Sequence, residues 1–155
     1  MLHLEGRSGE ALPVLQAAVA AARVAGAQVL LGLCLLSLGW AQLALEDVAH
    51  AKEAFLESLG LFAGTGNGEG SARALEACAA LAAARGLAEH GALLFGAAEG
   101  VRQSICAIVW VPDRPSHERT ERSLRAALGG REYEARLMKG IKLSLQEALD
   151  SASSL

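Results

Sequence analysis

Aromatic residues and prolines are scarce in this sequence. Aromatic side chains make up 4% of its 155 residues and only three prolines occur, although 52% of the residues are hydrophobic. The apolar mass is therefore alanine, leucine and valine, and the first two are strong helix formers that let helices approach closely. No long run alternates apolar with polar residues, as a half-buried strand would. These absences predict one all-α domain that is long enough to bury a real core.

The sequence also lacks an excess of positive charge. The net charge is −3; residues 1–112 carry six basic and ten acidic side chains, and residues 113–155 carry eight and seven. Nucleic-acid binding needs a basic patch that displaces counterions from the phosphates. Direct binding to nucleic acid is therefore not expected.

Cysteine is rare, and its pattern does not suggest disulfides. Cys34, Cys78 and Cys106 are an odd number, are widely spaced, and each lies in apolar sequence. This pattern predicts three small buried hydrophobic residues in a reducing compartment. The N-terminus shows no cleavable secretory signal, so we expect a cytoplasmic protein.

Charge is absent from one long stretch. No charged side chain occurs between Arg23 and Glu46, and an uncharged stretch of that length could span a bilayer. Polar Gln28 and Ser37 interrupt the stretch, and Gly26 breaks its start. We therefore expect a fully buried core helix and no membrane contact, with a membrane-anchored helical protein as the alternative.

Capping and breaking residues divide the chain into expected helices. The first five cover about 8–24, 28–45, 48–62, 71–85 and 88 to beyond 101, and the glycine-rich stretch "AGTGNGEG" separates the third from the fourth. A loop then contains two prolines, and Ser116 is expected to cap a helix over 117–128. Two short helices follow, one over 132–139 that ends at Gly140 and one opened by a Ser144–Glu147 capping box, before a frayed "SASSL" tail.

Three similar segments repeat at a constant spacing. "EALPVLQAAV" begins at Glu10, "HAKEAFLESL" at His50 and "HGALLFGAAE" at His90. Each has a small residue second and a bulky one sixth, which places a close helix contact and a space-filling side chain on the same face. Repeats with a period of this length are helical hairpins that bury their apolar faces against neighbours. We predict an α-α hairpin superhelix over residues 1–104, with the loop and helices of residues 105–155 forming a small cap within the same domain.

The middle repeat resembles a tetratricopeptide (TPR) unit. Gly39, Ala51 and Phe55 stand at the glycine, alanine and aromatic positions of that motif, with Leu35 and Leu38 at two apolar ones. It departs from the motif in three respects: Gln42 replaces the tyrosine, no proline closes the unit, and the period is longer.

A wider resemblance covers residues 35–148, which are similar to the C-terminal helical region of bacterial LuxR-type transcriptional regulators and signal-transduction ATPases. The phrases that carry it are "AFLESLGLF", "LEACAALAAARGLAEHGALLFGAAEGVR" and "ERSLRAALGGREYEARLMKGIKLSLQEAL". The nucleotide-binding motif and the helix-turn-helix of those proteins are absent here. The resemblance implies a non-enzymatic arm that binds a protein, a peptide or a small effector.

No motif in the sequence predicts catalysis, a cofactor or a metal ion. His50 and His90 occupy equivalent repeat positions without a ligand-like spacing, and we expect both to face solvent. "GTGNGEG" lacks the preceding strand of a phosphate-binding loop, so it is expected to be a turn. The class that remains is a binding or scaffold protein.

Five residues are candidates for contact with a partner. Trp40, Gln42, Arg73 and Glu76 are expected on the concave face lined by the first helix of each hairpin. Trp110 lies in the proline-bounded loop, where it either packs against the last hairpin or is exposed as a contact anchor.

The sequence also predicts self-association. The helix that would pair with the first one is missing before Gly6, which leaves an apolar flank at the N-terminal repeat edge. A homo-oligomer through that edge is expected, because apolar patches of that size rarely remain in water. A stand-alone adaptor that self-associates is therefore an alternative to a regulator arm.

Overall fold

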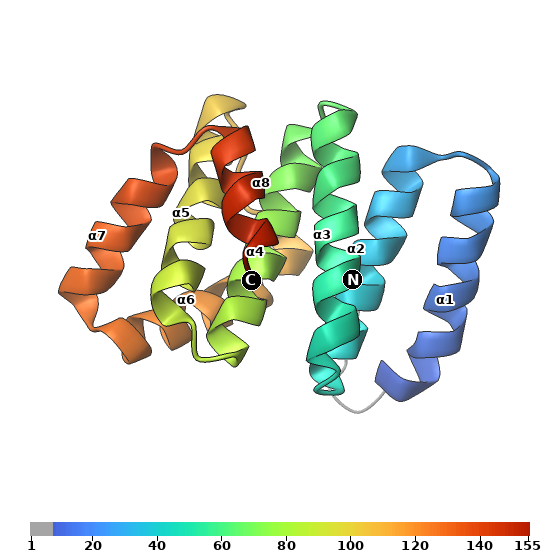
Figure 1. Cartoon of the computed structure of the whole chain (residues 1–155), viewed down its shortest axis with the longest axis horizontal. Helices are drawn as coiled ribbons and strands as arrows, with labels where there is room; N and C mark the ends of the chain where they lie inside the picture. Colours follow the sequence, from blue (N-terminus) through green and yellow to red (C-terminus); the bar gives the residue numbers. More distant parts are fainter. Residues whose placement is uncertain (1–7) are drawn as a thin grey trace.

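The computed structural model describes residues 8–155, which fold into eight α-helices and one short 3₁₀ helix without any β-strand (Figure 1). The helices are α1 (Ser8–Val24), α2 (Gln28–Ala44), α3 (Val48–Gly64), α4 (Gly68–Ala84), α5 (Ala88–Ser104), η1 (Val111–Asp113), α6 (Arg114–Leu128), α7 (Gly130–Ile141) and α8 (Leu145–Ser153). The prediction of an all-α protein is confirmed. The expectation of a missing helix before Gly6 falls on residues outside the described part of the chain.

The first five helices are strictly periodic. Each has 17 residues, and they begin at Ser8, Gln28, Val48, Gly68 and Ala88. The hairpin repeat expected from the sequence therefore consists of two helix-and-turn units of equal length.

The five turns that follow these helices are built alike. In each, the second residue has a positive φ: Gly26, Glu46, Gly66, Gly86 and Cys106. The next residue donates its backbone N–H to a carbonyl five residues earlier, as Asn67 does to Phe62 at 2.9 Å. This is the Schellman arrangement, which satisfies the last carbonyls of a helix and favours glycine at the left-handed position.

Consecutive helices pack in adjacent pairs, with phenylalanine rings set against glycines. Phe55 and Phe62 on α3 are completely buried. A Cβ at Gly32 on α2 would lie 2.8 Å from the Phe62 ring, and one at Gly39 would lie 2.5 Å from the Phe55 ring. Because these α2 positions have no side chain, the two helices come close enough for the rings to fill the space between them.

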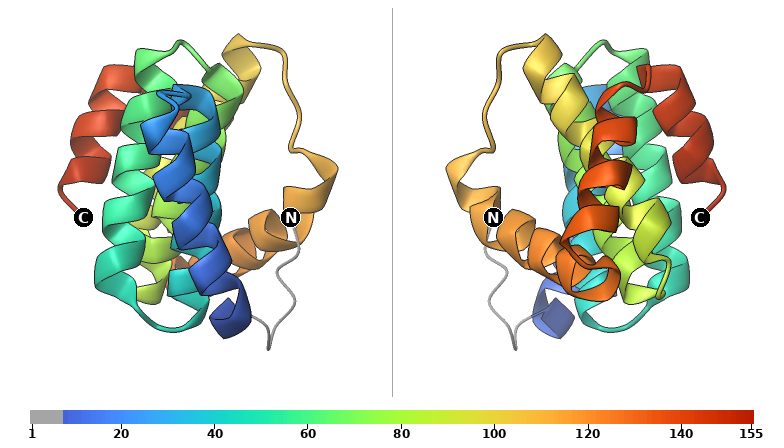
Figure 2. Two further views of the ribbon diagram at one scale, coloured as in Figure 1. Left: turned by 90° about the vertical axis from the view of Figure 1, so that its right-hand side faces the viewer. Right: turned by 90° about the vertical axis from the view of Figure 1, so that its left-hand side faces the viewer.

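The C-terminal helices occupy three different sides of the row. α7 packs on α5 at the end, whereas α6 crosses one face and contacts α4 and α5. α8 contacts α3, α4 and α5, and Figure 2 shows it on the side opposite the connection that leads to α6. The prediction that this region only covers the end of the stack is therefore incomplete: α7 alone does so.

Several expected boundaries were wrong. α4 begins at Gly68, because the Asn67 side chain accepts the Gly70 N–H at 2.8 Å and caps the helix inside the glycine-rich stretch. α6 begins at Arg114; the Ser116 hydroxyl donates to the Asp113 carbonyl at 3.0 Å and does not cap it.

The final segment is ordered, contrary to the expected fraying. The Ser144–Glu147 capping box is present and opens α8. Ala152 is completely buried and Leu155 is 6% exposed, because α8 packs across the α3–α5 helices. Within residues 8–155, no helix combines the length and the apolar character needed to cross a membrane.

Candidate functional site

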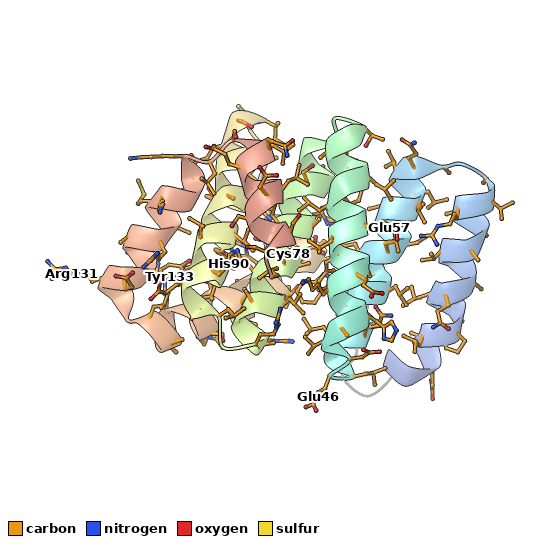
Figure 3. The ribbon with its side chains drawn as sticks, viewed as in Figure 1. Glu46, Glu57, Cys78, His90, Arg131 and Tyr133 are labelled. Atoms are coloured by element: carbon orange, nitrogen blue, oxygen red, sulfur yellow. The ribbon has the colours of Figure 1, made fainter. Side chains whose placement is uncertain are left out.

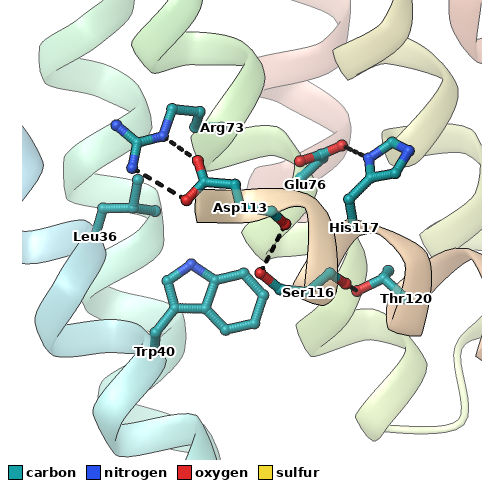
Figure 4. Close-up of a pocket in the computed structure, with 8 residues that line it drawn as sticks. All are labelled: Leu36, Trp40, Arg73, Glu76, Asp113, Ser116, His117 and Thr120. Carbon is teal, nitrogen blue, oxygen red and sulfur yellow. Dashed lines mark hydrogen bonds and ion pairs between the residues drawn. The ribbon is translucent and has the colours of Figure 1, made fainter. Parts of the chain in front are cut away.

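A small hollow lies between α2, α4 and the first turns of α6 (Figure 4). Its lining comes from four elements: Leu36 and Trp40 from α2, Arg73 and Glu76 from α4, Asp113 from η1, and Ser116, His117 and Thr120 from the first half of α6. We call the first four residues the α2–α4 face and residues 105–117 the strap. The space between them has room for about one water molecule.

Arg73 and Asp113 form the outer contact of the hollow. The Arg73 Nε donates to Asp113 Oδ2 at 2.6 Å and Nη2 donates to Oδ1 at 3.5 Å. The two side chains are only 14% and 16% exposed, so water screens the pair weakly. The guanidinium also lies 5.1 Å from the centre of the Trp110 indole, within the range of a cation–π contact. Arg73 therefore holds an acidic and an aromatic side chain of the strap at once.

Glu76 is a buried carboxylate with two basic neighbours. Its Oε2 accepts from Arg102 Nη2 on α5 at 2.8 Å, and its Oε1 is paired with the His117 Nδ1. Glu76 and Arg102 are 7% and 4% exposed. A buried charge is tolerated only when it is paired in this way, so Glu76 links α4 to both α5 and α6.

His117 is drawn toward its charged form by this contact. The hydrogen bond to Glu76 raises the pKa of the imidazole above 6.5, and partial burial opposes the rise. The ring also lies 4.7 Å from that of Phe95.

The sequence-predicted contact residues are only partly brought together. Trp40, Arg73 and Glu76 line the hollow, and Trp110, 48% exposed, reaches it through Arg73. Trp110 therefore fits both expected roles in part: its indole contacts Arg73 of α4, and about half of the residue is exposed to water. Gln42 is 8% exposed and lies outside the hollow, because residues two apart on a helix point about 200° apart.

The strap residues Asp113 and His117 were missed by the sequence analysis. His117 had no apparent role beyond opening a helix. Each contacts α4 from a position far along the chain, and no local pattern specifies the path of such a connection. Arg102 offered the one available signal, since a lone arginine at the end of the apolar α5 sequence needs a buried acidic partner.

His50, His90 and the three cysteines do not line the hollow; Figure 3 labels His90 and Cys78. His50 is exposed beside Asp47, but His90 is half-buried and its Nε2 lies 3.0 Å from the Ser151 hydroxyl of α8, so only His50 faces solvent as predicted. Cys78 is buried, which raises its pKa to about 12 and keeps the thiol protonated. Contrary to the prediction, Cys34 is only half-buried and Cys106 is exposed, the latter because it occupies the left-handed turn position.

The arrangement is suited to recognition of charged and aromatic groups. No cluster of three potential metal ligands is found in the part of the chain that the structure describes. Comparisons with protein-family models, with curated proteins and with solved structures found no match to this chain. Its function therefore has to be inferred from the site itself.

Proposed function

We propose that this chain is a non-enzymatic, TPR-like helical-repeat domain that binds a peptide segment of another protein on the α2–α4 face. One observation carries the proposal. The face already recognises a chain segment, since Arg73 and Glu76 bind the Asp113 and His117 side chains of the strap. A partner peptide with similar groups would use the same contacts.

The chemistry of the face supports recognition more than catalysis. Arg73 presents a planar guanidinium group whose N–H donors can pair with both oxygens of a carboxylate. Glu76 presents a carboxylate oxygen that can pair with a cation. Trp40 packs edge-on against Phe55, with ring centres 5.5 Å apart, and adds an aromatic wall. A small effector is the less favoured ligand, because the hollow has room for about one water molecule.

The wider context follows from the sequence resemblance. We propose that the helix pairs continue as a superhelix and serve as the interaction arm of a bacterial signalling or transcriptional regulator in the cytoplasm. In this role the domain would contact a protein partner and would not contact DNA directly.

Peptide selection tests the proposed function. A displayed library of short random peptides is enriched on the immobilised chain, and the selected peptides are measured on Arg73→Ala. We expect binding to fall by about tenfold or more, since a charge-assisted hydrogen bond contributes about 1.5–3 kcal/mol. Glu134→Gln, which removes an exposed ion pair between α7 and Arg125 of α6, should leave binding unchanged. If no peptide is enriched, or if Arg73→Ala binds equally well, the proposal is wrong.

Self-association through the N-terminal repeat edge is a second candidate, favoured by one comparison within the chain. The seventh residues of α1, α3 and α5 are Val14, Ala54 and Leu94, and their exposed fractions are 70%, 5% and 0%. The position that is buried in two helices is thus open in α1, where Val24 is also 91% exposed.

Light scattering after size-exclusion chromatography tests this second candidate. We expect a dimer or larger species in the wild type and a shift to monomer in Val14→Glu, which places a charge on the apolar flank. A wild-type monomer at high concentration would contradict self-association.

A further inference from the structure

We propose that the strap is an internal ligand of the α2–α4 face, and that the partner is a peptide with the same order of side chains: an aromatic residue, an acidic residue three positions later and a basic residue four positions after that. This inference rests on the proposed function. It adds the chemistry of the partner and the reason why the face is closed in the isolated chain.

The first support is that the strap contacts the α2–α4 face through charged and aromatic side chains and leaves part of its apolar surface in water. Its contacts with the face are the Arg73–Asp113 and Glu76–His117 pairs and the guanidinium–indole contact of Trp110. Two of its apolar side chains remain in water, since Ile108 is 76% exposed and Val111 is 63% exposed. Ile105 instead lies against the start of α4, where a Cβ at Gly68 would meet its Cγ2 atom at 3.2 Å. A segment that leaves its apolar groups in water is bound weakly compared with the helices beneath it.

The second support is that the packing of α6 against the core changes along the helix. Leu124 is completely buried, and a Cβ at Gly91 on α5 would lie 2.7 Å from its Cδ2 atom. Thr120 is 7% exposed. α6 is therefore anchored to the core at Thr120 and Leu124, whereas the strap between the α5 turn and Thr120 can leave the face without opening the packing around Leu124.

The third support is that the face has no free space for another ligand. The hollow has room for about one water molecule, and the contacts described above already engage Arg73 and both carboxylate oxygens of Glu76. A partner must therefore replace the strap, and the groups it must supply are those the strap now supplies. Trp110, Asp113 and His117 define the order aromatic, acidic, basic.

Because the strap is an intramolecular ligand, it also sets the affinity that a partner peptide needs in order to displace it. The strap competes at the high effective concentration of a short intramolecular connection, of the order of millimolar. A free peptide of equal chemistry should bind the wild type weakly and bind a chain with a loosened strap more tightly. That difference distinguishes an internal ligand from a fixed part of the fold.

The test uses the full chain and a synthetic peptide of residues 108–120, "IVWVPDRPSHERT". The strap is loosened by the double substitution Asp113→Asn and His117→Gln, with Asp113→Asn alone as a milder variant. Glu134→Gln is the matched control, because it removes a carboxylate of α7 that pairs with Arg125 of α6 away from the face. Circular dichroism melting establishes that each variant is folded, and the single variant is used if the double one is not.

We expect the amide of residue 113, which donates to the Trp110 carbonyl at 2.9 Å, to exchange about tenfold faster in the loosened variant, and the peptide to bind that variant about tenfold more tightly than it binds the wild type. The control should match the wild type in both measurements. A peptide with asparagine in place of its aspartate should lose most of this affinity.

Two outcomes would overturn the inference. Unchanged exchange in the loosened variant would mean that the ion pairs do not hold the strap. Faster exchange without tighter peptide binding would mean that the face does not recognise these side chains. If library-selected peptides still depend on Arg73 in that second case, only this inference fails and the proposed function stands.

Discussion

Glu76 is the residue through which the candidate site is joined to the core. One carboxylate oxygen binds Arg102 of α5 and the other binds His117 of α6. Because the group is 7% exposed, loss of either partner would leave charge in a poorly hydrated place. The two ion pairs of Glu76 therefore connect the strap to α4 and α5.

The His117 contact should make stability depend on pH. Its hydrogen bond to Glu76 raises the pKa of the folded imidazole above 6.5, so the folded chain holds this proton more tightly than the unfolded chain. The stability it contributes is present in full below pH 6.5 and is lost as the pH rises through the folded pKa. Urea unfolding of the wild type and of His117→Gln between pH 5 and 9 should show a difference in unfolding free energy that shrinks toward high pH. A difference independent of pH would contradict the assignment.

The turn residues predict a reciprocal pair of effects. Glu46 has φ 61° and Gly66 has φ 67° at equivalent turn positions, and a left-handed conformation costs a residue other than glycine about 1–2 kcal/mol. Glu46→Gly should therefore stabilise the chain by about 1 kcal/mol, and Gly66→Ala should destabilise it by a similar amount. Thermal melting followed by circular dichroism measures both. Shifts of the same sign would show that the two turns are not equivalent.

At the scale of the elements, the junction of α5 and α7 depends on backbone approach. A Cβ at Gly140 would collide with the Leu93 carbonyl oxygen and lie 2.9 Å from the Ala97 nitrogen. Gly140 was expected to end its helix, but it lies inside α7. The absence of a side chain at Gly140 lets α5 and α7 come into contact. In the sequence, a glycine that ends a helix cannot be told apart from a glycine that allows such a contact.

This junction predicts opposite effects for two glycine substitutions within helices. Gly140→Ala should destabilise the chain by about 1–3 kcal/mol, because the methyl group meets rigid backbone. Gly60→Ala in α3 has no atom within 4 Å of the new methyl and should stabilise it by about 0.5–1 kcal/mol through helix propensity. Urea unfolding compares the two, and a stabilising Gly140→Ala would contradict the packing described.

The elements differ in how far the sequence could predict them. α1 to α5 follow from local signals, because Gly26 and Asp47 mark turns and Ala51 and Phe55 mark a buried face. The start of α4 was missed because glycines suggested a break where the Asn67 cap allows a helix. The extent of α7 and the burial of Leu155 depend on contacts with distant helices, which helix periodicity does not encode.

At the scale of the whole molecule, the row of paired helices is enclosed from three sides by the last third of the chain. The sequence predicted the row and a cap, but not that the strap would lie on the α2–α4 face. That placement depends on a few long-range pairs, chiefly Arg73–Asp113 and Glu76–His117. Trp40, Arg73 and Glu76 could be predicted because they lie on regular helices, and their partners could not.

The indole N–H resonances test the central claim, which is that the α2–α4 face is the binding surface. The chain has two tryptophans: Trp40 lines the hollow and Trp110 contacts Arg73 of the same face. Titration of the ¹⁵N-labelled chain with a selected peptide should shift both signals together and saturate at the same concentration. Saturable binding that leaves both indole signals unchanged would show that the partner binds elsewhere.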